Sequence, residues 1–216
     1  MTNFFFRILT SIALIFLLYL SLQNSIVLFI VLLLLNFFTM IEFSFLFKNI
    51  FKKKKLFHFT SIVLSYTYIT LFSLVLWFYL MPVNNNNIVI IFLLIICISS
   101  DIGGFIFGKL IGGKKLTQIS PNKTYAGAIG SFCLSIVFGY LYFINFKHNL
   151  KFNLDIIFII LIISSISQLG DLIISFLKRK AKVKDTGKVL PGHGGILDRI
   201  DGMIVALPVG IMLISI

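Results

Sequence analysis

Acidic residues are scarce in this chain: it has seven Asp and Glu side chains against nineteen Lys and Arg in 216 residues. Charged residues together make up 12% of the sequence, whereas 59% of it is hydrophobic. So few polar side chains cannot cover the surface of a soluble globular protein. The composition therefore excludes the soluble classes and predicts an integral membrane protein.

Cysteine is nearly absent as well, and this excludes two kinds of scaffold. Cys97 and Cys133 both lie in apolar runs, with no CxxC or Cys/His spacing. A disulfide framework and a structural zinc site are therefore not expected. A small-x-small cleavage pattern is also missing after the first apolar segment, so we expect that segment to be retained as a helix.

Long apolar segments dominate the remaining sequence. A helix that crosses a bilayer needs roughly 20 apolar residues, and in lipid a helix satisfies its own backbone hydrogen bonds. We therefore predict an all-α, polytopic membrane protein with about seven transmembrane helices. The predicted spans are about 4 to 21, 26 to 47, 59 to 80, 88 to 107, 125 to 145, 155 to 175 and 200 to 216.

The basic residues give these spans an orientation. If the N-terminus is cytoplasmic, only Lys147 and Lys151 fall on the outer side, and the other seventeen Lys and Arg fall on the inner side. This asymmetry fits the positive-inside rule. It also accounts for the net charge of +12 without nucleic acid, which we do not expect as a partner. We expect a multi-pass protein of the cell inner (plasma) membrane.

The most polar stretch runs from Ser175 to Asp201 and reads SFLKRKAKVKDTGKVLPGHGGILDRID. Between Lys178 and Arg199 it holds seven of the nineteen basic residues, interleaved with two carboxylates and a Pro-Gly-His-Gly-Gly turn. Cations, carboxylates and glycine backbone crowded together indicate a phosphate site. A solvated basic face is the alternative.

Five of the seven acidic residues fall at or near predicted cytoplasmic helix ends, and only Glu42 and Asp155 stand apart. Asp198 and Asp201 are three residues apart at the start of the last predicted span, so we expect them on one helical face. With Asp171 from the preceding span they could converge on Mg²⁺, which prefers a few carboxylates plus phosphate oxygens. The alternative for Asp198 is a helix N-cap.

The turn between these carboxylates has two candidate roles. Gly192, Gly194 and Gly195 can adopt positive φ and expose main-chain N–H groups, which predicts an anion-binding nest, with an ordinary tight turn as the alternative. A phosphate monoester is already largely ionised at neutral pH. We therefore expect His193 to contact phosphate or orient the loop, and not to act as a general base.

A second polar region surrounds residues 101 to 127. The apolar run from 88 to 100 is too short to cross a bilayer unless the following residues are included, which places Asp101 inside the membrane or at its inner edge. A carboxylate there normally faces the protein interior. An ion pair with Lys109 or Lys123 that only holds helices together is the alternative. The loop that follows reads GGKKLTQISPNKTYAG.

Both regions resemble the phosphatidate cytidylyltransferase (CDP-diacylglycerol synthase) family. The weaker of the two patterns, Ser-Pro-x-Lys-Thr-aromatic-x-Gly, is matched at residues 120–127. Two positions in this region depart from the family. Ala126 stands where many members carry Glu or Gln, and Gly104 replaces the usual small residue. The resemblance covers about residues 91 to 216. The longer pattern is matched at Ser175, Lys178, Arg179, Lys184, Asp185, Gly187, Pro191, Gly192, His193, Gly194, Gly195, Asp198, Arg199 and Asp201.

The resemblance implies a reaction and a set of residues. CMP would pass from CTP to phosphatidic acid, giving CDP-diacylglycerol and pyrophosphate in phospholipid biosynthesis, with Mg²⁺ as cofactor and the active site on the cytoplasmic side. The implied catalytic residues are Asp171, Asp198, Asp201, Lys178, Arg179, Asp185 and His193, and the first three are also the implied metal ligands. The implied substrate-binding residues are Asp101, Ser120, Lys123, Thr124, Lys184, Gly192, Gly194, Gly195 and Arg199.

Residues 1–90 carry spans and charge but no specific motif. We therefore expect N-terminal transmembrane helices over 1–90 and a catalytic transmembrane core with cytoplasmic loops over 91–216, within one continuous membrane domain. The run Lys52 to Lys55 favours a topology anchor at anionic head groups, and recruitment of an anionic lipid substrate is the alternative. A homodimer is also among the expected assemblies.

Two other functions compete with cytidylyl transfer. A CTP-using lipid alcohol kinase would also place acidic residues at inner helix ends, although the full match of the longer pattern favours cytidylyl transfer. A transporter would place its ionisable groups near the membrane midplane in broken helices, whereas the polar residues here gather at one interface.

Overall fold

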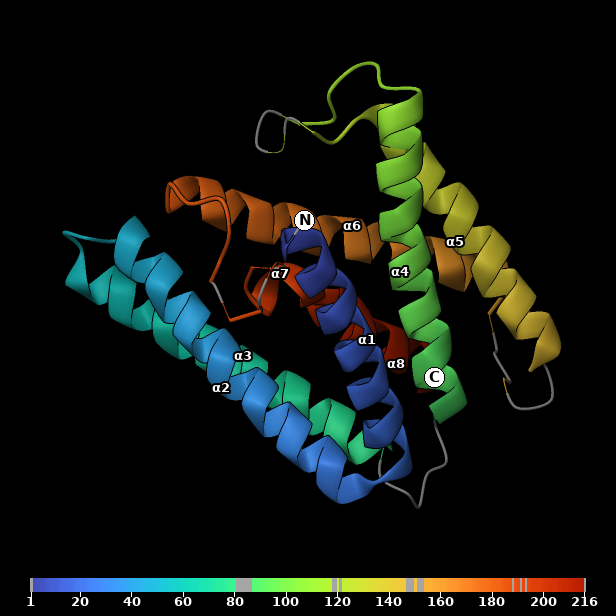
Figure 1. Cartoon of the computed structure of the whole chain (residues 1–216), viewed down its shortest axis with the longest axis horizontal. Helices are drawn as coiled ribbons and strands as arrows, with labels where there is room; N and C mark the ends of the chain where they lie inside the picture. The colour runs from blue at the N-terminus through green and yellow to red at the C-terminus, as the bar shows by residue number, and fades with distance from the viewer. Residues whose placement is uncertain are drawn as a thin grey trace. The chain divides into compact units, whose positions relative to one another are not determined.

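The computed structural model describes residues 2–80, 87–117, 120, 122–146, 150, 154–187, 189–190, 192 and 194–215, and the side chains of 8–214 among them. Over these residues the chain is helical and contains no strand, which confirms the all-α prediction (Figure 1). The helices are α1 (Thr2–Gln23), α2 (Ser25–Ile50), α3 (Lys55–Leu80), α4 (Asn87–Leu110), α5 (Tyr125–Asn145), α6 (Ile156–Lys180), α7 (Leu197–Ile200) and α8 (Met203–Ser215).

Five of the helices, α2 to α6, are long and apolar enough to cross a membrane. They match the second to sixth predicted spans, and the chain is therefore an all-helical, polytopic membrane protein. The first predicted span lies within α1, and the last corresponds to a shorter apolar helix, Met203–Ile214, within α8. The count of seven spans stays a prediction.

The last predicted span is broken at Asp201 and Gly202, which form a turn between α7 and α8. Gly202 packs against α6 so closely that a Cβ atom there would lie 2.5 Å from Ser167 Oγ. Asp198 therefore lies in α7 and Asp201 lies beyond its end. Because α7 ends at Ile200, directly before Asp201, the expectation that these two carboxylates share one helical face stays a prediction.

The chain divides into two compact units. The first unit comprises Met1–Asn85 and Leu177–Ile200, and the second comprises Asn86–Phe176 and Asp201–Ile216. Helix α6 contributes residues to both. The N-terminal helices thus form a unit with most of the signature segment, Ser175–Asp201. The expected division at residue 90 stays a prediction.

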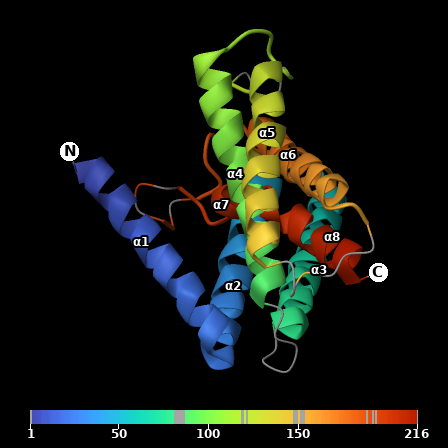
Figure 2. The same cartoon turned by 90° about the vertical axis from the view of Figure 1, so that its right-hand side faces the viewer.

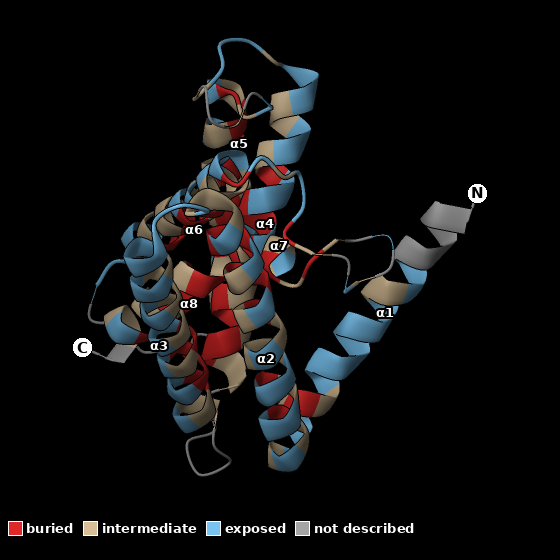
Figure 3. Ribbon diagram, turned by 90° about the vertical axis from the view of Figure 1, so that its left-hand side faces the viewer, coloured by how far each residue is buried: buried red, intermediate tan, exposed pale blue. Residues whose placement is uncertain are grey.

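In the first unit, α2 packs against both α1 and α3. Asn24 separates α1 from α2 and caps α2, because its Oδ1 accepts hydrogen bonds from Ile26 N (2.9 Å) and Val27 N (3.4 Å). Ser44 and the hydroxyl of Tyr66 lie 2.5 Å apart and link α2 to α3. Buried side chains follow α2, whereas α1 is largely exposed (Figure 3).

The second unit is built on the close packing of α4 against α5 (Figure 2). A Cβ atom on Gly103 would lie 2.3 Å from Gly130 O, so the two helices meet through small residues, as membrane helices often do. Polar contacts reinforce the packing: Ser131 Oγ donates to Ser100 O (2.7 Å), and Ser100 Oγ lies 3.0 Å from Ser164 Oγ on α6. This framework positions the pocket described below.

Candidate active site

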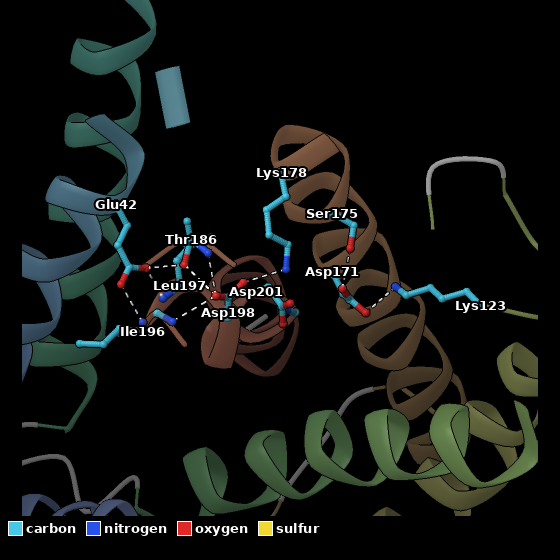
Figure 4. Close-up of polar contacts among 12 residues, drawn as sticks. Glu42, Lys123, Asp171, Ser175, Lys178, Thr186, Ile196, Leu197, Asp198 and Asp201 are labelled. Atoms are coloured by element: carbon cyan, nitrogen blue, oxygen red, sulfur yellow. Dashed lines mark hydrogen bonds and ion pairs between the residues drawn. The ribbon is translucent and has the colours of Figure 1, made fainter. Parts of the chain in front are cut away.

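In the first unit, the signature segment folds around the carboxylate of Asp198 (Figure 4). Lys178 Nζ, at the end of α6, donates to Asp198 Oδ1 at 2.7 Å. Asp198 Oδ2 accepts from Thr186 N at 2.8 Å, Thr186 Oγ1 at 3.0 Å and Gly195 N at 3.1 Å. One carboxylate thus joins three separate parts of the signature segment. A helix N-cap, the alternative role for this residue, would not account for the contacts with Lys178 and Thr186.

The same contacts set the charge of Asp198. Burial alone would raise the pKa of its carboxyl group, but the hydrogen bonds from Lys178, Thr186 and Gly195 and the charge of Lys178 hold the pKa below its ordinary value. The Asp198 side chain is only 6% exposed and that of Lys178 16%. An ionised carboxylate with a largely buried ammonium partner therefore lies at the centre of the loop.

Glu42 and Thr186 belong to this site although neither was predicted from the sequence. Glu42 lies on α2, is 2% exposed, and accepts hydrogen bonds from Thr186 Oγ1 (2.7 Å), Leu197 N (2.8 Å) and Ile196 N (2.9 Å). The signal was present in the sequence, because a lone carboxylate in an apolar span needs a partner. Its partners could not be read from the sequence, since they lie more than 140 positions away.

In the second unit, a pocket of about 310 Å³ collects several residues that were predicted separately. Asp101 lies on α4, Ser120 and Lys123 lie in the loop before α5, and Asp171 lies on α6. Gln168 Nε2, one turn before Asp171, is buried and has no hydrogen-bond partner among the described residues. The remaining residues of the lining are Gly104, Phe105, Leu116, Asn122, Thr124, Gly127, Ala128, Ser131 and Leu172.

Lys123 and Asp171 form an ion pair within this pocket (Figure 4). Ser175 Oγ also donates to the Asp171 carboxylate, at 3.3 Å from Oδ1. Lys109 lies over the Phe105 ring instead, 5.7 Å from its centroid. Among the described ion pairs Asp101 has none with Lys109 or Lys123, because Lys123 is engaged by Asp171, so the described contacts do not support the alternative of a purely structural ion pair for Asp101.

The loop before α5 is held by its own backbone. Leu116 N donates to Lys123 O (2.8 Å), and Thr124 Oγ1 caps α5 by accepting from Gly127 N (3.0 Å). The Thr124 hydroxyl therefore has a role in the fold, and its predicted contact with substrate stays a prediction. Lys123, by contrast, is placed by this turn with its ammonium group in the pocket.

The glycine turn differs in part from its predicted form. Gly192 and Gly194 have positive φ, 76° and 85°, as expected. Gly195 is not among the described glycines with positive φ, and its N–H donates to Asp198. The Gly194 N–H donates to Leu190 O at 3.1 Å. The prediction that Gly194 and Gly195 expose their N–H groups is therefore wrong, because the protein itself provides the acceptors.

The remaining predicted site residues are Asp201, His193 and several exposed residues of the signature segment. Asp201 belongs to the second unit, where a Cβ atom on Gly170 would lie 2.7 Å from its carbonyl oxygen. Its Oδ1 accepts from Gly202 N at 2.8 Å. His193 lies outside the described residues. Of the predicted site residues in the signature segment, the exposed ones that the structure describes are Arg179, Lys184, Asp185, Gly192 and Arg199.

A divalent cation needs oxygen ligands, and carboxylates are common donors of them. Among the described residues, no group of three His, Cys, Asp or Glu side chains lies close enough to hold a metal ion. Asp171 and Asp198 are each paired with a lysine instead. Magnesium binding by Asp171, Asp198 and Asp201 stays a prediction.

The chain is similar in sequence to several known bacterial proteins. A region of 112 residues, half of the chain, is 49% identical to a phosphatidate cytidylyltransferase of Staphylococcus aureus. A region of 109 residues is 44% identical to the protein of that name from Helicobacter pylori. The matched regions span 42% and 40% of these relatives, so the similarity covers less than half of their length. The model of the cytidylyltransferase family matches residues 1–216, and the chain belongs to that family.

Proposed function

We propose that this chain transfers CMP from CTP to phosphatidic acid, giving CDP-diacylglycerol and pyrophosphate. The observation that carries the proposal is the pocket of the second unit, in which Asp101, Ser120, Lys123 and Asp171 line one cavity. Relatives named phosphatidate cytidylyltransferase, similar over half of the chain, support the same reaction. The ammonium group of this cavity suits a substrate that carries several phosphates, and its carboxylates suit a divalent cation that those phosphates would bring.

In the proposed reaction, a phosphate oxygen of phosphatidic acid attacks the α-phosphorus of CTP. The bond from that phosphorus to the oxygen that bridges to the β-phosphate breaks, and pyrophosphate leaves. The second ionisation of a phosphate monoester lies near pH ~6, so the attacking oxygen is already largely anionic. The reaction therefore needs no general base, and the proposed role of His193 is to contact phosphate or to orient the loop.

The main obstacle to this reaction is the repulsion between two anionic substrates. Fixed cations lower it by positioning the phosphates and by stabilising the charge that moves to the leaving group. Lys123 is the ammonium group that lines the pocket, and Asp171 holds it there. The exposed basic residues Arg179, Lys184 and Arg199 of the signature segment are candidates for phosphate contacts.

Magnesium is part of the proposal. A bound Mg²⁺ would neutralise phosphate charge, and it is typically held by one or two carboxylates together with the phosphates of the substrate. Asp171, Asp198 and Asp201 remain the proposed ligands. In each of the first two residues a carboxylate oxygen now paired with lysine would have to become available to the metal.

The proposed site faces the cytoplasm of a plasma membrane, where CTP is available. The support for this orientation is the placement of seventeen of the nineteen basic residues on one side of the predicted spans. Phosphatidic acid would enter from the lipid, since its acyl chains stay in the bilayer.

Radiolabelled CTP tests the reaction. Purified protein in vesicles that contain phosphatidic acid is incubated with Mg²⁺ and with CTP labelled at either the α- or the γ-phosphorus. We expect label in the extracted lipid from α-labelled CTP only, with pyrophosphate released in equal amount, and no lipid label for Asp198→Asn or after chelation of Mg²⁺. Lipid label from γ-labelled CTP would identify a kinase and contradict the proposal.

A further inference from the structure

Glu42 is a buried carboxylate in the candidate membrane span Ser25–Ile50. A carboxylate in such a span is costly unless it is paired or fully hydrogen-bonded. The three donors that the structure describes for Glu42 come from one segment, residues 186–197, which belongs to the same compact unit. The carboxylate therefore connects an N-terminal helix to the signature segment.

Both carboxylate oxygens take part in this contact. Oε1 accepts from Ile196 N, and Oε2 accepts from Leu197 N and from the Thr186 hydroxyl. The two oxygens accept from three donors at 2.7 to 2.9 Å, and Glu42 as a whole is 2% exposed. Little room therefore remains for a substrate atom. Glu42 is therefore suited to hold the loop in place and not to contact the reacting groups.

Two glycines of the signature pattern make room for this carboxylate. A Cβ atom on Gly195 would lie 2.6 Å from both Glu42 oxygens and 2.1 Å from Thr186 Oγ1. A Cβ atom on Gly187 would lie 2.8 Å from Glu42 Oε1, and all three of its nearest atoms belong to Glu42. Real Cβ atoms essentially never approach another heavy atom this closely. The Glu42 carboxylate thus gives a steric reason for glycine at both positions.

Thr186 extends the contact to Asp198. Its hydroxyl lies 2.7 Å from Glu42 Oε2 and 3.0 Å from Asp198 Oδ2, and its main-chain N–H donates to the same Asp198 oxygen (Figure 4). The hydroxyl has one hydrogen and therefore donates to one carboxylate at a time. The position of Asp198 depends on Thr186, whose position depends in turn on Glu42.

We propose that Glu42 is a positioning residue of the active site: it fixes the signature loop on the N-terminal helices and thereby sets the place of the Asp198 carboxylate. The effect on catalysis rests on the proposed function, whereas the effect on the loop does not. The two effects are therefore measured separately.

The loop is tested by limited digestion with trypsin in detergent micelles. The segment contains exposed Lys182 and Lys184, and cleavage there follows the fraction of molecules in which the loop is open. We expect Glu42→Gln to speed this cleavage by about tenfold or more, because an amide replaces one acceptor oxygen and leaves buried N–H groups unsatisfied. Thr39→Val is the matched control, since Thr39 is also buried on α2 but its hydroxyl bonds only to its own helix, at Leu35 O and Asn36 O.

Gly187 gives a second test that does not depend on how well a single variant folds. Gly187→Ala should open the loop when Glu42 is present, because the new methyl group meets the carboxylate. In Glu42→Ala the same methyl group has space, so the double variant should be cleaved no faster than Glu42→Ala alone. Additive effects of the two substitutions would show that Gly187 and Glu42 are not coupled and would overturn the proposal.

Turnover is the readout for catalysis. In Glu42→Gln we expect kcat to fall about tenfold or more with KM for CTP changed by less than about threefold, because the pocket of the second unit is untouched. Loop opening without any change in kcat would contradict the positioning role. If the wild-type protein makes no CDP-diacylglycerol, the proposed function fails, and the digestion experiments still decide whether Glu42 holds the loop.

Discussion

Lys178 Nζ donates to Asp198 Oδ1 at 2.7 Å, and this contact closes the signature segment on itself across twenty positions. Both side chains are largely buried, at 16% and 6% exposure. A buried charge that loses its partner is strongly destabilising. The pair is therefore the feature of the loop whose removal should have the largest structural effect.

The first prediction concerns the pH dependence of Lys178→Met. In the wild type the lowered pKa of Asp198 keeps the carboxylate ionised, and its stabilising contribution is lost only when the pH falls through that lowered pKa. Removal of Lys178 takes away a hydrogen bond and a charge that lower the pKa, while burial still raises it. The loss of stability should therefore begin at a higher pH in the variant. Thermal unfolding in detergent between pH 8 and pH 4 measures this, and equal pH profiles for both proteins would contradict it.

The second prediction concerns the cation of the pocket. Lys123→Met removes the ion-pair partner of Asp171 and one positive charge from the pocket lining. We expect kcat/KM for CTP to fall by at least about tenfold, since charge-assisted contacts to phosphate are among the stronger hydrogen bonds. Lys109→Met is the matched control, because Lys109 lies over Phe105 and does not line the pocket. Similar losses in both variants would mean that only net charge matters.

The third prediction separates stability from binding at Gln168. Its buried Nε2 has no partner in the described structure and lines the pocket. Gln168→Met keeps the length of the side chain and removes the unsatisfied group, so the melting temperature without substrate should stay the same or rise. KM for CTP or phosphatidic acid should increase if the amide donates to a substrate. A lower melting temperature with unchanged KM would show that Gln168 serves only the fold.

The fourth prediction concerns the hydroxyl shared by Glu42 and Asp198. Thr186→Val keeps the shape of this buried side chain but removes the donor, whereas Thr186→Ser keeps the donor. We expect the Ser variant to retain most activity and the Val variant to lose about tenfold in kcat, because the one hydroxyl hydrogen that the two buried carboxylates share is lost. Equal activities of Ser and Val would assign Thr186 a packing role alone.

The apolar helices could be predicted from the sequence because a membrane span depends on local composition. The predicted span 26–47 became α2 and 125–145 became α5, with ends within about three residues. The break after α7 was missed, because it depends on how closely Gly202 approaches Ser167 on α6. A pattern of apolar residues carries no information about such a contact.

The candidate site could be predicted only in part. Residue types identified Lys123, Asp171 and Asp198, since charge in an apolar chain marks a polar site. Glu42 could not be assigned to that site, because its donors are main-chain N–H groups and a hydroxyl from a distant segment. Likewise, glycine at 195 suggested backbone freedom, whereas the structure explains it by crowding.

The fate of the phosphate oxygens tests the proposed reaction most directly. Phosphatidic acid with ¹⁸O in its three terminal phosphate oxygens is incubated with CTP and the purified protein, and the products are analysed by mass spectrometry. Attack by the lipid phosphate on the α-phosphorus predicts CDP-diacylglycerol that retains all three labelled oxygens and pyrophosphate that contains none. Labelled pyrophosphate, or phosphatidic acid that is not converted to a CDP-lipid, would contradict the account.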